Sequence, residues 1–309
     1  MSQLIAVDAG HGYVKALRAT GERLMFPSLI ASAPPTVDLG HFADPETVQI
    51  DHDRFVVGEP ARAYATPLWS RQKAADEDTL RLILVAAAQL GAVGPVQLAT
   101  GLPLSWFGPQ RKAFREALTG FGGTVRLPGH PVPQRLWFES VRVLPQGVAA
   151  AVVALANPTY RPGPYIVVDV GYRTTEYLVV EKRPDGKLAY DATQAGSLET
   201  GTHAVGMALA AALEREYHVA FTAAEVESSE SVFIRGQAVS LAPYRANAES
   251  HTAAQLHDQL TEVLDARLDK TAGIVLVGGG STLLADTFPR ATVVPDAQWA
   301  NAQAYLSAL

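Results

Sequence analysis

Near the start of the chain stands the stretch Ala6-Val7-Asp8-Ala9-Gly10, and 161 residues later stands Val167-Val168-Asp169-Val170-Gly171. Each stretch ends a short apolar run on a carboxylate and then a glycine, a pattern typical of a buried strand that enters a tight turn. A second strand-like run follows each, at residues 13–17 and 177–180. Because the offset is about half of the 309 residues, the repeat predicts two similar lobes, each opened by a strand–turn–strand unit.

A third apolar run, residues 274–277, leads into the glycine-rich segment 278–281. Helical patterns of apolar residues lie between these strand-like runs. Strands that alternate with helices predict an α/β protein built in layers. The expected helices span residues 78–90, 109–118, 146–155, 202–217, 252–268 and 297–309.

Composition narrows the classes of function. The chain has no cysteine, which excludes disulfide scaffolds, cysteine zinc sites and cysteine nucleophiles. Its net charge is −6 without a block of Lys or Arg, so no direct binding of nucleic acid is expected. The first eight residues contain no basic leader, and the most apolar internal stretch, 147–156, is too short to span a bilayer. A cytoplasmic protein without a membrane contact is therefore expected.

The segment from Asp8 to Lys15 has residue types that suit phosphate binding. Glycines at positions 10 and 12 let backbone N–H groups approach phosphate oxygens without a Cβ in the way. Lys15 adds a point charge, whereas Asp8 makes sense only through a Mg²⁺ ion that keeps its waters. An ordinary hairpin with a surface lysine is the alternative interpretation.

The two other glycine turns allow the same interpretation. After Asp169 and Gly171, the hydroxyls of Thr174 and Thr175 could meet a terminal phosphate. The three glycines at 278–280 are entropically costly and suggest that a ligand packs on bare backbone. A threonine-rich hairpin and a loose loop are the alternatives for these two segments.

Signatures of other enzyme classes are missing from the sequence. It contains no Gly-Lys-Ser/Thr phosphate loop, no Gly-x-Ser-x-Gly nucleophile elbow and no His-Glu-x-x-His pair. Zinc hydrolases and serine hydrolases therefore have little support.

The order of the segments resembles the superfamily of actins, heat-shock chaperone ATPase domains and sugar kinases. Residues 8–15 resemble its first phosphate loop and residues 169–176 its second. Residues 145–150 resemble the first connecting helix, residues 277–284 the adenosine motif, and residues 301–302 the second connecting segment. The resemblance covers nearly the whole chain. It implies an actin-like fold of two ribonuclease H-like lobes, with a nucleotide cleft between them and small inserted subdomains.

Within that superfamily the chain is similar to the plasmid-segregation actins of the ParM-like (StbA-like) group of bacteria and archaea. The similarity rests on residues 100–104 followed by 110–118, on 58–61 and on 295–302.

The resemblance also implies a division into lobes. Lobe I would comprise residues 1–145 and 295–309, with an inserted subdomain at about 31–75. Lobe II would comprise residues 146–294, with an inserted subdomain at about 203–270.

The resemblance implies that ATP or ADP binds with Mg²⁺, which Asp8 and Asp169 would hold through water. Gln146 would orient the attacking water with help from Glu176, and Lys15 would neutralise phosphate charge. Asp8, Gln146, Asp169 and Glu176 are thus the expected catalytic residues. The residues expected to bind the cofactor are Asp8, Gly10, His11, Gly12, Tyr13, Lys15, Asp169, Gly171, Tyr172, Arg173, Thr174, Gly201, Thr202, Gly278, Gly279, Gly280 and Ser281.

A slow ATPase that assembles with itself into nucleotide-dependent filaments is the function that the resemblance implies. The filaments would serve plasmid or DNA segregation or another cytoskeletal role, and in segregation a DNA-binding adaptor protein would be a second partner. Arg173 and Glu176 depart from the family's usual glycine and aspartate, which bears on the hydrolysis rate. The alternative is a sugar or acid kinase of the same superfamily, for which the middle of the chain offers no convincing general-base aspartate.

Overall fold

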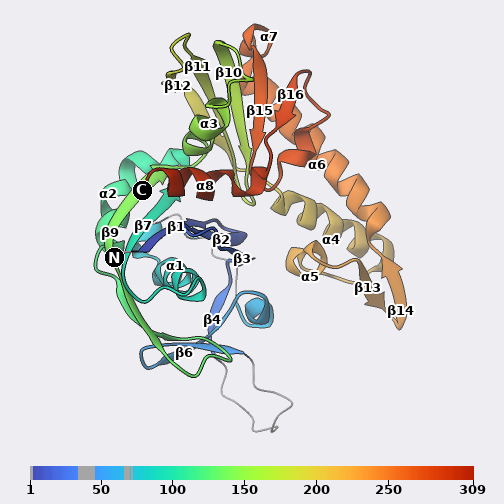
Figure 1. Ribbon diagram of the computed structural model, residues 1–309. Helices are drawn as coiled ribbons and strands as arrows, with labels where there is room; N and C mark the ends of the chain where they lie inside the picture. Colours follow the sequence, from blue (N-terminus) through green and yellow to red (C-terminus); the bar gives the residue numbers. More distant parts are fainter. Residues whose placement is uncertain (1–2, 34–45, 66–69, 71) are drawn as a thin grey trace. The chain divides into compact units, whose positions relative to one another are not determined.

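The computed structural model describes residues 3–33, 46–65, 70 and 72–309 (Figure 1). The chain forms two compact units, Met1–Ala150 with Asn301–Leu309, and Ala151–Ala300. It passes from one unit to the other within the helix α3 (Val148–Leu155) and at the start of α8 (Ala300–Ser307). Part of the expected insertion at 31–75, namely residues 34–45, 66–69 and 71, lies outside the described residues.

The first unit is built on a mixed sheet with the strand order β3-β2-β1-β7-β9-β8-β5-β6-β4. Side chains of the central strand β1 alternate between the two faces, as the pleat requires. Ile5 and Val7 belong to the large core with α1, whereas Ala6 packs with Tyr305 of α8. The strands are β1 (Gln3–Ala9), β2 (Tyr13–Arg18), β3 (Arg23–Pro27), β4 (Ile30–Ser32), β5 (Thr47–Ile50), β6 (Asp53–Val57), β7 (Gly94–Leu102), β8 (Gly122–Arg126) and β9 (Gln134–Pro145).

Helices α1 and α2 also pack on the sheet of this unit. Helix α1 (Glu77–Gln89) starts with two acidic residues, which favour a helix N-terminus. It contacts β1 and β2 and is apolar almost all round, as expected of a buried helix. Helix α2 (Leu104–Leu118) contacts β7 and β9. Two short 3-10 helices, η2 (Glu59–Ala63) and η3 (Lys73–Ala75), precede α1.

The second unit is built on a smaller sheet with the strand order β12-β11-β10-β15-β16. On one face, Ile166, Val168 and Val170 of β10 pack against Leu256 and Leu260 of α6. Figure 1 shows the sheet and α6 of this unit. The elements are β10 (Gly163–Val170), β11 (Thr175–Lys182), β12 (Leu188–Leu198), β15 (Gly273–Val277), β16 (Ala291–Val293), α6 (Ala242–Leu264), α7 (Arg267–Lys270), η4 (Ser281–Leu284) and η5 (Ala297–Trp299).

A separate small core lies at one end of the second unit. It joins α4 (His203–Tyr217), α5 (Ala223–Glu227) and the N-terminal half of α6 to the hairpin of β13 (Ser231–Ile234) and β14 (Gln237–Ser240). None of the described helices is long and apolar enough to cross a membrane.

The predicted repeat is confirmed within each unit. The order β3-β2-β1-β7-β9 of the first sheet corresponds strand for strand to β12-β11-β10-β15-β16 of the second, with the same directions at the centre. The register is also the same, because Asp8 pairs with Lys15 and Asp169 pairs with Glu176. Both units therefore have the core strand arrangement of the expected actin-like fold.

Two expected helix starts are wrong. Helix α2 begins at Leu104 rather than at 109, and Pro109 lies inside it. Proline has no N–H, so Pro109 leaves the carbonyl of Ser105 without its usual helical donor. Both residues are exposed, and water can donate to that carbonyl instead. Helix α6 begins at Ala242 rather than at 252, because Pro243 lies in its first turn, where proline is tolerated.

Gly101 of β7 offers a test of how α8 docks on the first unit. A Cβ on Gly101 would lie 2.9 Å from Cε2 of the fully buried Tyr305 and closer still to its hydroxyl. Gly101→Ala should therefore lower the free energy of unfolding by about 1–3 kcal/mol. The control is Gly273→Ala in β15, where the nearest atoms lie at 3.5 Å or more and where we expect no loss. Equal stabilities of the two variants in urea unfolding would contradict this view of the α8 contact.

Candidate functional site

The first turn, between β1 and β2, surrounds a buried carboxylate. Asp8 is only 4% exposed. Its Oδ2 lies 3.5 Å from Nζ of Lys15, and its Oδ1 accepts a hydrogen bond of 2.9 Å from Nε2 of Gln146. One cation and one amide thus hold the charged form of Asp8 in place. Three residues that the sequence analysis selected, Asp8, Lys15 and Gln146, are therefore in contact.

The backbone of this turn is fixed from several sides. The N–H of Gly10 donates to the carbonyl of Tyr13 at 3.1 Å. Ser28 contributes twice, since its Oγ donates to the carbonyl of Gly10 at 2.6 Å and its N–H to that of Gly12 at 2.9 Å. These bonds use carbonyl oxygens of the turn, which orients its peptide groups. The side chain of His11 packs edge-on against Trp106 of α2, with ring centroids 5.5 Å apart.

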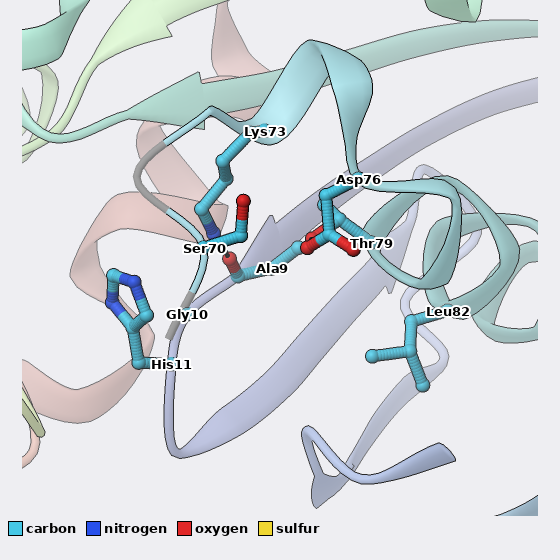
Figure 2. A pocket seen from close by; sticks show the side chains of 8 residues that line it. All are labelled: Ala9, Gly10, His11, Ser70, Lys73, Asp76, Thr79 and Leu82. Carbon is cyan, nitrogen blue, oxygen red and sulfur yellow. Dashed lines mark hydrogen bonds between the residues drawn. The ribbon is translucent and has the colours of Figure 1, made fainter. Parts of the chain in front are cut away.

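Lys73 is a part of this site that the sequence analysis missed. Its Nζ donates to the carbonyl of Ala9, and the residue is 4% exposed. Figure 2 shows Lys73 together with Ala9 and Gly10 in a small pocket that Asp76 and Thr79 also line. No motif marks Lys73, because more than 60 residues separate it from the turn that it contacts.

Burial lowers the pKa of Lys73 to about 8, and the nearby carboxylates of Asp8 and Asp76 offset part of that effect. The Lys73 ammonium therefore adds a second positive charge near Asp8, after that of Lys15, and its burial separates it from the bulk solvent.

Gln146 and Asn301 fix the junction at the start of α3. The N–H of Gln146 donates to the carbonyl of Leu102 at 2.9 Å. The side-chain oxygen of Asn301 accepts a hydrogen bond of 3.0 Å from the N–H of Gly147. Both bonds lie within the first unit. These two bonds fix the backbone from which the Gln146 side chain reaches Asp8. A Gln146 that only capped α3 would not make the hydrogen bond to Asp8.

The second turn, between β10 and β11, contains a pair of buried carboxylates. Asp169 and Glu176 stand opposite each other in the register, and each is 3% exposed. The N–H of Gly171 donates to the carbonyl of Thr174 at 2.9 Å, as Gly10 does in the first turn. The Thr174 hydroxyl donates to Oε1 of Glu176 at 2.9 Å. Glu176 is thus a buried, hydrogen-bonded group and not a solvated strand residue.

Arg173 has an ionic partner of its own. Its Nη2 lies 3.4 Å from Oε2 of Glu199, which is more than half exposed. Ion pairs of this kind contribute little to stability. In this structure the guanidinium group of Arg173 therefore contacts Glu199.

Glycines bring two further segments against the second turn. A Cβ on Gly201 would lie 2.6 Å from the carbonyl oxygens of Gly171 and Tyr172, and a Cβ on Gly280 would lie 2.6 Å from the side chain of Val170. Gly278 has a φ of +86° and would likewise clash with the end of β10. Only glycine permits this close approach.

Backbone hydrogen bonds join the same segments. The N–H groups of Thr202 and His203 donate to the carbonyls of Gly171 and Tyr172 at 3.0 and 2.8 Å, and that of Gly280 donates to Val170 at 2.9 Å. Ser281 is buried at the start of η4, next to these glycines. The residues of the second unit that were selected from the sequence therefore belong to three segments in contact with one another, 169–176, 201–203 and 278–281. Gly279 lies at the edge of this group, near Gln298.

A polar cluster behind Tyr172 was also missed. The Tyr172 hydroxyl lies 2.9 and 3.0 Å from the two carboxylate oxygens of Glu227 and 2.9 Å from Nδ1 of His203. Nδ1 of His203 lies 3.0 Å from Oε1 of Glu227. This cluster connects the second turn to α4 and α5. Glu225, also on α5, instead closes a capping box with Thr222.

The site residues thus form two sets, one in each unit. Within residues 3–33, 46–65, 70 and 72–309, no three His, Asp or Glu side chains are arranged to hold a metal ion. Each set offers one buried aspartate at a strand end and a glycine turn beside it. Such turns suit an anion that approaches the backbone closely.

Comparison with known proteins agrees with this geometry. Residues 6–148 match the family of actin-like proteins in its N-terminal domain, and residues 167–290 match the C-terminal domain of the archaeal, MreB-like actin homologues. The chain belongs to the actin-like proteins. Over 99% of its length it is 28% identical to an archaeal actin homolog of Thermoplasma acidophilum, 98% of which is covered. A homolog from Thermoplasma volcanium gives the same identity and coverage.

Solved structures of actin-like proteins share the fold. The archaeal actin homolog Ta0583, in complex with ADP, gives a TM-score of 0.82 at 25% identity, with 99% of this chain and 98% of that chain covered. A ParM subunit from a 15-stranded filament of Clostridium botulinum gives 0.82 at 20% identity with the same coverage. The expected actin-like fold of this actin-like protein is therefore confirmed.

The lowered pKa of Lys73 makes a prediction about stability. Between pH 8 and pH 10.5 the unfolded chain binds a proton at Lys73 that the folded chain has released, so this group makes the free energy of unfolding rise with pH. Below pH 8 the buried charge costs about 3 kcal/mol. Lys73→Met removes the buried charge and should therefore have a higher free energy of unfolding than the wild type at pH 7. This difference in the free energy of unfolding should shrink as the pH rises from 8 to 10.5.

Urea unfolding of both proteins from pH 7 to pH 10.5 measures the effect. Lys112→Met is the control, because the Lys112 side chain is 80% exposed. Its pH profile should follow that of the wild type. Parallel profiles for Lys73→Met and the wild type would mean that Lys73 is not buried as a cation.

Proposed function

We propose that this actin-like protein is a slow ATPase that binds Mg-ATP and assembles with itself into filaments in a nucleotide-dependent way. The observation that carries the proposal is the repeated turn, in which a buried aspartate precedes a glycine in the same register in both units. The ADP complex of the 25% identical homolog supports nucleotide binding. The ParM filament has the same fold and is consistent with self-association.

The donor set fits a magnesium nucleotide. Asp8 and Asp169 are buried, and among the described residues neither belongs to a group of three His, Asp or Glu side chains that could form a cage, which suits an ion bound mainly by phosphates and water. The N–H groups of Gly10 and Gly171 close the turns, and the half-buried residues that follow them, 11–13 and 172–173, would offer their backbone amides to phosphate oxygens. We propose that one nucleotide engages both turns. Bound Mg-ATP would supply the phosphoryl group and the ion that neutralises its charge.

The residues around the turns have separate roles in this proposal. Lys15 offsets charge on the phosphates. Gln146, held on Asp8 by its amide, orients the attacking water, since an amide is too weak a base to take its proton. Glu176 is buried beside Thr174 and assists in that orientation. Gly201, Thr202 and the segment 278–281 would contact the nucleoside part.

A nucleotide that engages both units would favour one conformation of the chain over others, and hydrolysis would weaken that preference. Assembly then depends on the nucleotide state. We propose plasmid or DNA segregation as the cellular role of the filament. Because a net charge of −6 disfavours nonspecific binding to the DNA backbone, we propose a DNA-binding adaptor protein as the link to DNA.

A double-mutant cycle tests whether the two aspartates serve one ion. Asp8→Asn and Asp169→Asn should each weaken binding of ATP in the presence of Mg²⁺. The double variant should be weakened by less than the product of the single effects, with a coupling energy of about 1 kcal/mol or more. The coupling should vanish when EDTA removes Mg²⁺.

The control cycle pairs Asp8→Asn with Asp185→Asn. Asp185 lies in an exposed turn between β11 and β12, and its effect should be additive. Additive effects of Asp8 and Asp169 in the presence of Mg²⁺ would contradict a shared site.

Sedimentation tests assembly. The wild-type protein should pellet with Mg-ATP and less with Mg-ADP, and Asp169→Asn should stay in the supernatant under both conditions. Gln146→Ala should pellet with ATP and remain assembled for longer, because hydrolysis is slowed. Absence of ATP-dependent pelleting at high protein concentration and at several salt concentrations would rule out the filament proposal while leaving nucleotide binding intact.

A further inference from the structure

A second hollow lies in the first unit, among residues that the proposed function does not use. It has a volume of about 620 Å³ and is formed by β5, β6, the end of β8 and the loop that follows β8. Pockets that bind small molecules have volumes of this order, about 300–1,000 Å³. Its lining includes Arg54, Arg126 and His130 but no acidic residue among those that the structure describes. The hollow is thus basic in a chain whose net charge is −6.

Strand register explains why these side chains gather. Arg54 of β6 stands directly opposite Gln49 of β5, and Gln49 stands directly opposite Arg126 of β8. Residues that face each other across neighbouring strands project from the same face of the sheet. The strands that carry the two arginines are two spacings apart, about 10 Å. Both guanidinium groups can therefore reach an anion that lies over Gln49.

The other face of the same strands belongs to the core. Val48, Ile50, Phe55 and Val125 are buried in the large cluster of the first unit. The basic row is consequently held on rigid, well-packed strands. The backbone of a site on such a scaffold loses little conformational freedom when a ligand binds.

The two arginines have hydrogen-bond donors to spare. Nη2 of Arg54 donates to the Thr47 hydroxyl at 3.0 Å, which leaves its other N–H groups available. The Arg126 side chain is exposed and makes no hydrogen bond or ion pair with the part of the chain that the structure describes. Planar guanidinium forks suit phosphate oxygens, which they bind in a bidentate manner.

The loop after β8 adds an apolar wall. It contains Pro128 and Pro131, whose rings restrict the backbone, and the N–H of His130 donates to the carbonyl of Leu127 at 3.1 Å. Leu127 is buried beneath it. The hollow therefore offers cationic donors on one side and a stiff apolar surface on the other.

We propose that this hollow binds the phosphate group of a small organic molecule, with Arg54 and Arg126 on the phosphate and the proline loop against the organic part. This site shares no residue with the two glycine turns and does not depend on the proposed ATPase activity. It gives the first unit a second ligand of its own.

Arginine Nε–Hε resonances of the ¹⁵N-labelled full chain provide a local readout, assigned by loss of signal in Arg54→Gln and Arg126→Gln. Titration with glucose 1,6-bisphosphate should shift the Arg54 and Arg126 signals to saturation, and inorganic phosphate should do so at least about threefold more weakly. Each single variant should weaken binding at least about tenfold, measured by calorimetry. Arg115→Gln, an exposed substitution on α2, should bind as the wild type does.

Three outcomes would overturn the proposal. The first is the absence of saturable shifts of Arg54 and Arg126 with either probe. The second is equal affinity of the double variant Arg54→Gln/Arg126→Gln and the wild type, which would place the binding elsewhere. The third is equal affinity for inorganic phosphate and the bisphosphate, which would show that the organic part makes no contact. Circular dichroism and melting temperature of each variant check that the fold is retained.

Discussion

The structure depends on one local constraint, a carboxylate that ends a buried strand and is followed at once by a glycine turn. A buried charge is tolerated only when hydrogen bonds and opposite charges surround it. Asp8 meets this condition through Lys15 and Gln146, so β2 and the start of α3 must approach the end of β1. In the second unit, Gly201, Gly278 and Gly280 allow other backbone segments to close around the end of β10 in a similar way.

This constraint links the fold to the proposed chemistry. The N–H of Gly10 donates to Tyr13 and that of Gly171 to Thr174, so both turns are closed by the same hydrogen bond, and turns of this kind can bind anions. Additional contacts differ between the units. Lys73 and Ser28 fix the first turn, whereas the second is tied through Tyr172 to His203 and Glu227. The repeated turn is thus held in place by two unrelated sets of neighbours.

Buried cations and exposed cations have different uses in the first unit. Lys73 is held beside the first turn at a cost in desolvation, which lowers its pKa to about 8. Arg54 and Arg126 stand on the outer face of the sheet, where water stabilises their charge. Lys73 therefore holds the backbone of the first turn in place through Ala9, whereas the two arginines are available to a ligand.

The sequence by itself determined the repeated strand–turn–strand unit, the α/β class and the resemblance to actin-like proteins, because strand periodicity and glycine turns are local signals. It also selected Asp8, Lys15 and Gln146, which the fold brings into contact. Only the tertiary structure placed Lys73 on Ala9 and joined His203 to Glu227, since those contacts bring together residues far apart in the chain without a motif. The early start of α2 was likewise decided by the tertiary structure, because Pro109 lies inside that helix, where proline costs about 3 kcal/mol. Helix α6 starts early at a position that is compatible with the local sequence, since Pro243 lies in its first turn.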